Sequence, residues 1–290
     1  MKILLTGATG QLGNEIQQRV PAAVQLIALS SQQLDITDAG QVQSVIQQHQ
    51  PAIVINAAAY TQVDKAESES ERAFAVNQRG VANLVAATTA QTRLLHISTD
   101  FVFDGLSQEP YATTASTNPL SVYGKSKLAG EQVLLTQAPQ RSCIIRTAWL
   151  YSAGSKNFMH TMLQLMQSRD SLRVVADQRG TPTSAAGLAA AVWRAVQLPE
   201  LGGILHWTDD GETTWHGFAC EIQRLGLAYG LLHKQVPIHP IATHEYPTPA
   251  RRPAYSVLEK ESTFAALGLR AQPWQQALES VIQQRKERTA

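Results

Sequence analysis

The chain opens with a short apolar run that leads directly into three glycines spaced three residues apart. Residues 2–5 are followed by Gly7, Gly10 and Gly13, which form a G-x-x-G-x-x-G pattern. Glycines let a backbone turn tightly and approach a pyrophosphate, whose charge is favoured by free amides and by the positive end of a helix. The pattern therefore predicts a strand, a tight turn that binds a dinucleotide, and a helix. A tight turn without a ligand is the simpler alternative.

The first half of the chain alternates β-rich runs with helix-like stretches. Strands are predicted at residues 2–5, 24–29, 52–56, 94–98 and 143–149, and helices at 11–19, 39–48, 67–90 and 122–136. Strands that are apolar on consecutive residues are typical of parallel sheets covered on both faces. The alternation predicts an α/β fold with a Rossmann-like, doubly wound parallel sheet.

The second half of the chain is punctuated by prolines, and only shorter helices stand out, at residues 215–225 and 273–285. We expect residues 1–150 to form a dinucleotide-binding domain. Residues 151–290 are expected to form mainly a smaller α/β substrate-binding lobe. The two parts are expected to interleave, with later segments returning to the first.

The charge balance and the absence of long apolar runs exclude several classes of partner. There are 24 Lys and Arg against 23 Asp and Glu, a formal charge of +1, which is too balanced for broad capture of nucleic acid or an anionic membrane. No apolar stretch approaches the roughly 18 residues of a membrane span, and no secretion signal is visible. Cys143 and Cys220 are expected to be buried free thiols, which fits a reducing, cytoplasmic setting. The partner expected is a small molecule.

Several positions along the predicted sheet edge are suited to the rest of a dinucleotide. The second strand ends at Ser30, where an acid would bind a free ribose 2′-hydroxyl and repel a 2′-phosphate, so NADPH is mildly preferred over NADH. Asp35 could accept from the adenine amino group while Ile36 packs on the ring; alternatively Asp35 caps the following helix. Ala58 and Ala59 leave room where a ligand passes the end of the third strand.

Tyr123 and Lys127 lie four residues apart in a predicted helix, so their side chains share one face. A neighbouring ammonium favours the phenolate and brings the phenol nearer the pH at which it can donate a proton. Thr99 ends a buried strand, where its hydroxyl could bond a reacting carbonyl oxygen. The three residues predict a catalytic trio, against the alternative that they are unconnected.

Eight strings, spread along nearly the whole chain, carry a resemblance to a known family. They are ILLTGATGQLG, VINAAAYTQVDKAE, HISTDFVFDG, NPLSVYGKSKLAGE, IRTAWLY, DQRGTPT, TTWHGFA and YPTPARRP. With them the sequence resembles the extended short-chain dehydrogenase/reductase superfamily and, within it, the dTDP-4-dehydrorhamnose reductase family. The resemblance implies reduction of the C4 ketone of dTDP-4-dehydro-β-L-rhamnose to dTDP-β-L-rhamnose by NADPH or NADH, the last step of dTDP-L-rhamnose synthesis for polysaccharides.

The resemblance also implies roles for individual residues. Tyr123 would be the proton donor, Lys127 would hold the nicotinamide ribose, and Thr99 with Asp100 would face the sugar. Trp149 matches the substrate-contacting tryptophan of the family. The implied cofactor contacts are Gly10, Gln11 and Leu12 at the pyrophosphate turn and Ser30, Asp35, Ile36, Ala59 and Thr61 beyond it. Arg252, in the proline-stiffened string 246–253, could anchor the substrate diphosphate, or could simply be a solvated surface arginine.

Departures from the family's pattern bear on metal and assembly. Some relatives dimerise around a divalent ion, such as Mg²⁺, held by glutamates. Glu15 is available here, but residues 184–187 offer no second acid, so we expect no metal site and either a monomer or a homodimer.

Two other functions stay open at this point. One is a nucleotide-sugar epimerase or dehydratase, which would share the glycine turn and the Tyr and Lys pair. The other is a catalytically silent nucleotide-binding subunit that regulates a partner.

Overall fold

The computed structural model describes residues 1–288 and is built around a six-stranded sheet. The strands are β1 (Lys2–Thr6), β2 (Gln25–Leu29), β3 (Ile53–Asn56), β4 (Arg93–Thr99), β5 (Ser142–Thr147) and β10 (Gly203–His206). They lie in the order β2-β1-β3-β4-β5-β10, and every neighbouring pair is parallel. The order reverses at β1, and in sheets of this kind ligands bind outside the carboxyl ends of the strands at such a reversal.

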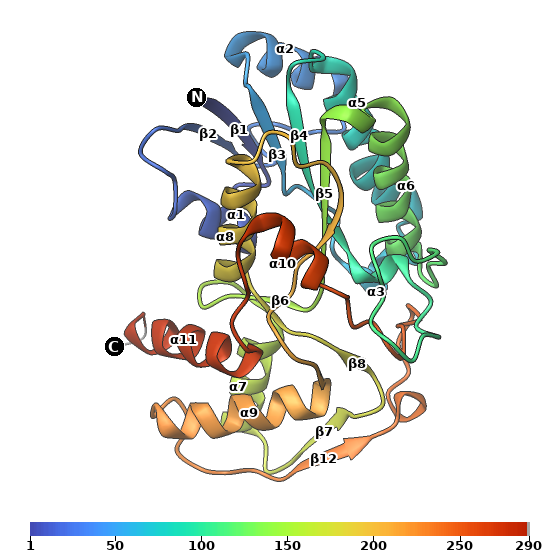
Figure 1. The fold of residues 1–290 in the computed structure, drawn as a ribbon. Helices are drawn as coiled ribbons and strands as arrows, with labels where there is room; N and C mark the ends of the chain where they lie inside the picture. The colour runs from blue at the N-terminus through green and yellow to red at the C-terminus, as the bar shows by residue number, and fades with distance from the viewer. Residues whose placement is uncertain (289–290) are drawn as a thin grey trace.

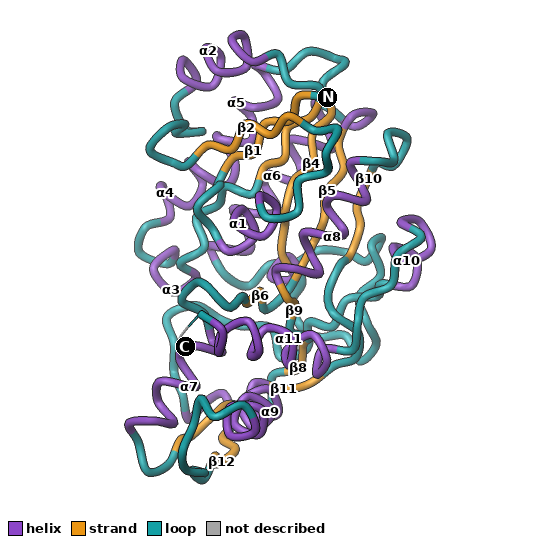
Figure 2. The backbone as a smooth tube through the Cα atoms, turned by 90° about the vertical axis from the view of Figure 1, so that its left-hand side faces the viewer, coloured by secondary structure: helices purple, strands orange, loops and turns teal. Residues whose placement is uncertain are grey.

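Helices cover both faces of this sheet, as Figures 1 and 2 show. On one face α1 (Gln11–Gln17) packs on α8 (Ala185–Val196), with α10 (Glu261–Leu267) beside them. On the other face lie α2 (Ala39–His49), α5 (Gly80–Ala87) and α6 (Val122–Gln137). Successive residues of β1 alternate between the two cores: Ile3 and Leu5 face the first, and Leu4 faces the second. The expectation of a doubly wound parallel sheet is therefore confirmed.

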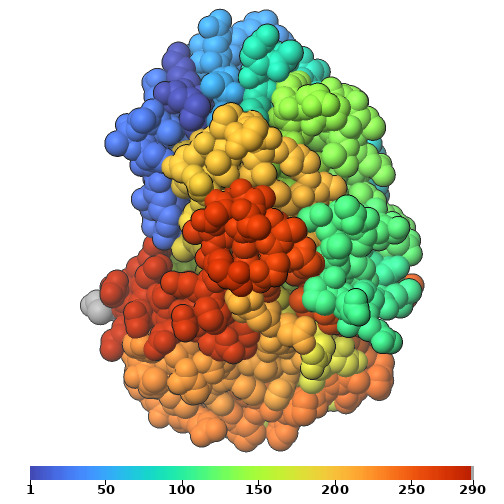
Figure 3. All heavy atoms as spheres, viewed as in Figure 1, coloured from blue at the N-terminus to red at the C-terminus, as the bar shows by residue number. Residues whose placement is uncertain are grey.

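The remaining elements form a lobe below the sheet in Figure 1 with a core of its own. It contains α7 (Phe158–Ser168), α9 (Trp215–Ala228) and α11 (Trp274–Glu287), with β7 (Leu172–Val175) paired to β12 (Ile238–Ile241). Two more short pairs, β6 (Leu150–Tyr151) with β9 (Thr183–Ser184) and β8 (Arg179–Gly180) with β11 (Thr213–Thr214), connect this lobe to the sheet. In Figure 3 the orange and red C-terminal residues fill the lower part of the visible face and continue upward over the sheet domain.

Two predicted elements differ in the structure. The helix expected at residues 67–90 is broken into α4 (Ser70–Phe74), a π-helical turn (Ala75–Arg79) and α5, preceded by the short α3 (Val63–Ala66). The strand expected to reach Trp149 ends at Thr147, because Trp149 adopts a left-handed backbone conformation with φ +46°. β10 and α8 were not foreseen from the sequence. β10 and α8 belong to the second half of the chain and return to the sheet. The boundary near residue 150 between a dinucleotide-binding domain and a substrate-binding lobe stays a prediction.

The two cysteines differ in their surroundings. Cys143 is a buried free thiol in β5, as expected, whereas Cys220 is exposed on α9, so the prediction of a second buried thiol is wrong. Residue 220 falls on the outer face of its helix, while Phe218, Ala219 and Ile222 face the lobe core. None of the helices described within residues 1–288 is long and apolar enough to cross a bilayer.

Candidate functional site

The turn between β1 and α1 leaves no space for side chains at two of its glycines. Gly7 has φ +70°, and a Cβ there would lie 2.6 Å from the backbone nitrogen of Ala58. A Cβ on Gly13 would overlap the carbonyl oxygen of Gly7. Gly10 precedes α1 and donates its N–H to Gly7 over 3.0 Å. Side chains at Gly7 and Gly13 would collide with the backbone of the protein itself, so only glycine allows a turn this tight. A tight glycine turn between a first strand and a first helix is the kind that binds a pyrophosphate.

Gln11 and Leu12 follow Gly10, and their side chains lie in different places. The Leu12 side chain is buried in the core, so only its backbone is available to a ligand. Gln11 instead reaches the second lobe, where its side-chain oxygen accepts from Ser152 and from Asn157 over 3.0 and 2.9 Å. Gln11 therefore ties the turn to the segment that follows β6.

Further along the predicted cofactor path, Ser30 and Asp35 already have local partners. The Ser30 hydroxyl donates to Gln33 over 3.0 Å, and Asp35 accepts from the backbone and hydroxyl of Thr37. Asp38, not Asp35, caps α2, so the capping alternative for Asp35 is wrong.

The other residues of this path differ in exposure. Ile36 is buried against Gly80, Ala58 and Ala59 are half-buried, and Thr61 is exposed. Ile36 can therefore offer a ligand little more than its backbone and the edge of its side chain.

The three candidate catalytic residues gather where β4 meets the first turns of α6. Ser121 caps α6 and Tyr123 lies in its first turn, facing Thr99 at the end of β4. Burial raises the pKa of Tyr123 to about 12; the hydrogen bond with Thr99 opposes this rise, and the charge of Asp100 adds to it. Phe101 packs edge-on against the Tyr123 ring, with centroids 5.6 Å apart.

Lys127 is buried one turn further along α6. Its Nζ donates to the carbonyl of Ile97 over 2.6 Å and lies 3.3 Å from Nε2 of His96. Burial lowers the pKa of Lys127 to about 8, and the charge of Glu131 opposes that shift. Lys127 is not among the groups that shift the pKa of Tyr123. The expectation that its ammonium brings down that pKa is therefore wrong in this structure, because burial dominates.

Asp100 follows Thr99 and is almost fully buried, at 1% exposure. Burial raises its pKa to about 6, while hydrogen bonds with Ser256 and Thr99 oppose the rise. One carboxylate oxygen accepts from the Thr99 hydroxyl over 3.1 Å, and the other has no partner among the described residues. A buried polar atom without a partner costs free energy, so this oxygen is a ready acceptor for a ligand hydroxyl.

Trp149 follows β5 and belongs to an aromatic stack. Its ring lies 3.6 Å from that of Trp215 with an angle of 10° between the planes, and Phe158 packs on Trp215 in turn. Gly180 makes room for the indole, since a Cβ there would lie 2.7 Å from it. The left-handed backbone of Trp149 and this close fit hold the ring in one place.

The Arg252 side chain is bound to Asp64 of the sheet domain and is not a free surface arginine. Its guanidinium donates to both carboxylate oxygens of Asp64, over 3.1 and 2.8 Å, and the backbone of Ala250 donates to the same carboxylate. The hydrogen bond from Arg252 lowers the pKa of Asp64. The bond spans 188 residues of sequence and fastens the C-terminal segment to α3.

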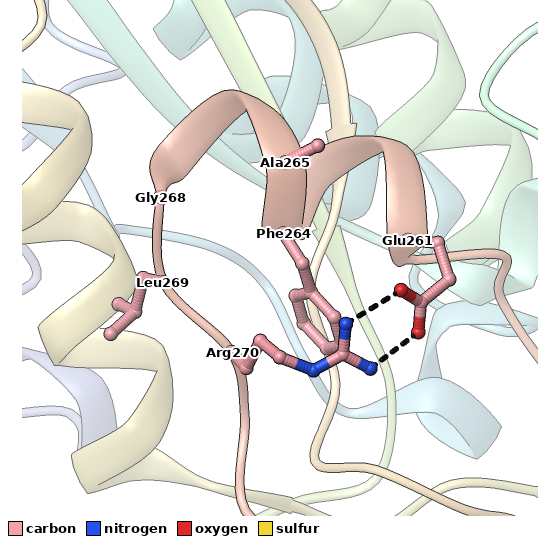
Figure 4. A pocket seen from close by; sticks show the side chains of 6 residues that line it. All are labelled: Glu261, Phe264, Ala265, Gly268, Leu269 and Arg270. Carbon is pink, nitrogen blue, oxygen red and sulfur yellow. Dashed lines mark hydrogen bonds and ion pairs between the residues drawn. The ribbon is translucent and has the colours of Figure 1, made fainter.

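A hollow of about 290 Å³ beside α10 shares no residue with these candidates. Glu261 and Arg270 close one side of it with two hydrogen bonds, and Phe264 lies beneath the guanidinium (Figure 4). Within residues 1–288 no group of three or more His, Cys, Asp or Glu side chains is arranged to hold a metal ion. Glu15 is paired with Arg19.

Comparisons with known proteins give one consistent result. The family model described as the RmlD substrate binding domain matches residues 1–287. A dTDP-4-dehydrorhamnose reductase of Aggregatibacter actinomycetemcomitans is 40% identical over 288 residues, covering 97% of this chain and 98% of the relative. The chain belongs to the dTDP-4-dehydrorhamnose reductase family.

Solved structures of the family agree with this membership. The reductase from Clostridium acetobutylicum has a TM-score of 0.92 and 41% identity, and that from Bacillus anthracis, in complex with NADP, has 0.90 and 34%. Each alignment covers 98% of this chain and 99% of the other. The described part of this chain therefore has the fold of the family.

Sequence reasoning missed several buried polar residues behind the candidate site. His96 contacts Lys127, and Glu131 pairs with Arg146 at 2.7 Å within the sheet and helix core. His96 lies within one of the strings that carry the resemblance, but hydrophobic periodicity gives no sign of it, because β4 is buried on both faces. A histidine between Leu95 and Ile97, in the middle of a buried strand, was the available signal.

Proposed function

We propose that this chain reduces the C4 ketone of dTDP-4-dehydro-β-L-rhamnose to dTDP-β-L-rhamnose, using a reduced nicotinamide nucleotide. The observation that carries the proposal is the meeting of Tyr123 and Thr99 at the carboxyl end of β4, in a sheet whose first turn is a bare glycine cradle. A proton donor and a nucleotide turn at the same sheet edge are what a ketone reductase needs. Membership of the family supports the same reaction.

In this proposal Tyr123 is the general acid. The glycine turn would hold the pyrophosphate of a reduced nicotinamide nucleotide, and that nucleotide would supply the hydride. As negative charge grows on the ketone oxygen, Tyr123 donates its proton to that oxygen, and Thr99 stays bonded to the phenol oxygen. A positively charged Lys127 would stabilise the phenolate that remains. The elevated pKa of Tyr123 keeps the phenol protonated until the oxyanion forms.

The cofactor contacts proposed are the backbone of Gly7, Gly10, Gln11, Leu12 and Gly13 at the turn, with Ser30, Asp35, Ile36, Ala58, Ala59, Thr61, Tyr123 and Lys127 beyond it. Ser30 carries no charge, so we propose that NADPH is accepted and mildly preferred. The Bacillus anthracis relative was solved with NADP, which agrees with this choice.

The substrate contacts proposed are Thr99, Asp100, Trp149 and Arg252. The partnerless oxygen of Asp100 is suited to a sugar hydroxyl, and the fixed indole of Trp149 to the face of a ring. The carboxylate of Asp64 fixes the orientation of Arg252, whose remaining donors are available to the diphosphate.

The deciding experiment follows the absorbance of NADPH with purified protein and the 4-keto sugar nucleotide. We expect one equivalent of NADPH to be consumed for each ketone reduced, and consumption about 10²–10⁴-fold slower in Tyr123→Phe. An epimerase or dehydratase would convert the sugar without net consumption. A silent subunit would leave both NADPH and NADH unchanged.

Location and assembly follow from the same proposal. A soluble biosynthetic enzyme that uses a cellular nicotinamide pool, with two free cysteines, is best placed in the cytoplasm. We propose a monomer or homodimer without a structural Mg²⁺, because Glu15 is already paired with Arg19. Gel filtration with and without chelator tests both points.

A further inference from the structure

The side chain of Gln11 connects the nucleotide turn to the segment that follows Trp149. Gln11 is the first residue of α1, directly after the glycine turn. Its side-chain nitrogen donates to the carbonyl of Leu150 over 3.3 Å. Its side-chain oxygen accepts from the hydroxyl of Ser152 over 3.0 Å and from the side-chain nitrogen of Asn157 over 2.9 Å. One side chain of the sheet domain thus holds three points of this segment.

The partners of Gln11 fix which way its amide faces. The carbonyl of Leu150 can only accept, so it must face the Gln11 nitrogen. The side-chain nitrogen of Asn157 also donates to the carbonyls of Ser152 and Ser155, over 2.7 and 2.9 Å. It must therefore face the oxygen of Gln11. The position needs a donor and an acceptor on one side chain, which glutamine supplies; an acid offers only acceptors there and a lysine only donors.

Both ends of the segment that Gln11 holds adjoin the aromatic stack. Trp149 immediately precedes the first bonded residue, and its ring lies 3.6 Å from that of Trp215. At the other end Asn157 caps α7, and the next residue, Phe158, packs on Trp215 with ring centroids 4.7 Å apart. Gln11 therefore bonds the chain neighbours of two of the three rings, including the ring proposed to contact the sugar.

The middle of this segment is packed on its own lobe and not on α1. Ala153 is buried in the lobe core, and its carbonyl lies 3.0 Å from Nε2 of His160. Gly154 and Lys156 are exposed. A hollow of about 270 Å³, lined by α1, by residues of this segment and by Arg288, lies on the side facing α1. Hydrogen bonds from Gln11, and not close packing, therefore join the segment to the helix of the nucleotide turn.

The backbone of Gln11 belongs to the other site, because it is one of the positions proposed above to hold the pyrophosphate. A ligand that orders the backbone of residues 10–12 also restricts the Gln11 side chain. Less conformational freedom is then left to be lost when that side chain bonds residues 150–157. Linkage between two binding events is reciprocal, so a ligand that orders this segment would in turn favour the dinucleotide.

We propose that Gln11 is a positioning residue that couples the nucleotide turn to the sugar site, because its side chain holds residues 150–157 and with them Trp149. The segment has two arrangements, one bonded to Gln11 and one released from it. The dinucleotide and the nucleotide sugar both favour the bonded arrangement, so each tightens the binding of the other. This coupling rests on the proposed function, which assigns the two ligands to the two sites.

The first test observes the segment in the protein without any sugar nucleotide. Hydrogen exchange of backbone amides is followed by mass spectrometry for peptides that cover residues 150–163, with and without saturating NADPH. We expect NADPH to slow the exchange of this region in the unmodified chain by about fivefold or more, the lower end of common coupling strengths. Exchange that NADPH leaves unchanged in the unmodified chain overturns the proposal, whether or not any variant folds.

A pair of glutamine variants tests whether the Gln11 side chain carries the coupling. Gln11→Ala removes the amide but keeps the backbone of the turn, so we expect NADPH to bind and no longer to slow exchange in residues 150–163. Gln18→Ala is the matched control, because Gln18 is exposed at the end of the same helix and borders the same hollow. The protection should remain in this control. Protection that persists undiminished in Gln11→Ala contradicts the proposal.

A variant on the lobe side breaks the same connection without touching the turn. Asn157→Asp keeps the oxygen that accepts from the backbone of His160 and caps α7. It replaces the nitrogen that donates to Gln11 with an oxygen, so two acceptors would face each other. We expect the protection by NADPH to be lost here too, and full protection in Asn157→Asp would also overturn the proposal.

The consequence for the sugar site is measured with dTDP-β-L-rhamnose, the product of the proposed reaction, which cannot react with NADPH. Isothermal titration calorimetry gives its dissociation constant with and without NADPH. We expect NADPH to tighten binding about fivefold or more in the unmodified chain and in Gln18→Ala, and to leave it nearly unchanged in Gln11→Ala. A purely structural role for Gln11 would weaken both dissociation constants and keep their ratio as in the unmodified chain.

These measurements separate the coupling from the proposed reaction. If NADPH is not oxidised by the 4-keto sugar nucleotide, the proposed reduction fails, while protection of residues 150–163 by NADPH still supports the link through Gln11. If NADPH is oxidised but leaves that segment unprotected, the coupling fails and the reduction stands.

Discussion

Breaking the buried ion pair between Glu131 and Arg146 is expected to destabilise the fold strongly. The two side chains are 0% and 3% exposed, and Glu131 accepts from Arg146 over 2.9 and 2.7 Å and from the hydroxyl of Ser98. Glu131→Gln keeps the size of the side chain but removes its charge, which leaves the Arg146 guanidinium buried without a counter-charge. Breaking a buried pair in this way costs about 3–5 kcal/mol of unfolding free energy.

The neighbouring His206 does not compensate for this loss. Nη1 of Arg146 lies 3.5 Å from the His206 ring, but burial, with help from Arg146, lowers the pKa of His206 to about 4. His206 is therefore neutral at the pH of the experiment, and it supplies no negative charge to replace Glu131.

The matched control is the ion pair of the same two residue types shown in Figure 4. Glu261 accepts two hydrogen bonds of 2.8 Å from Arg270, but the side chains are 63% and 64% exposed. Exposed pairs contribute about 0–1 kcal/mol, so Glu261→Gln should change little. Urea unfolding with linear extrapolation measures both variants, and the two losses should differ by about 3 kcal/mol. Equal losses, or a loss below about 1 kcal/mol for Glu131→Gln, would refute the burial argument.

Three further outcomes are expected. Tyr123→Phe should lower kcat by about 10²–10⁴-fold with little change in nucleotide affinity, because only the proton donor is removed; near-normal turnover in the NADPH assay would end its assignment as the acid. Ser30→Asp should weaken NADPH relative to NADH by roughly tenfold, about 1.4 kcal/mol, through repulsion of the 2′-phosphate, and an unchanged ratio of the two dissociation constants would mean that Ser30 does not face the ribose. Arg252→Ala should raise KM for the sugar nucleotide by about 10-fold or more through loss of a charged hydrogen bond, and it should return the pKa of Asp64 upward because that pKa is lowered by Arg252; an unchanged KM with a shifted Asp64 pKa would leave Arg252 a purely structural role.

Local patterns determined much of the sheet and the first candidates for the site. The apolar runs fall within one or two residues of β1, β2, β3 and β4, because a strand covered on both faces must be largely apolar. The spacing of the three glycines and of Tyr123 and Lys127 was equally readable, since a turn and one face of a helix are set by residues close in sequence.

The sequence could not determine features that depend on distant segments. β10 joins the sheet from the second half of the chain, and Trp149 breaks its strand where Gly180 and Trp215 receive the indole. The residue pair Arg252 and Asp64 is formed across 188 positions, so no local pattern reports it.

The electrostatics of the site were also decided only by packing. Sequence spacing correctly placed Tyr123 and Lys127 on one helix, but it gave the wrong sign for the pKa shift of Tyr123, because burial raises that pKa to about 12. The contact of His96 with Lys127 likewise exists only when β4 and α6 pack together. The spacing of residues along a helix predicts which side chains share a face. The pKa shift of a side chain also depends on how far water is removed from it, and that is set by all the segments that cover the face.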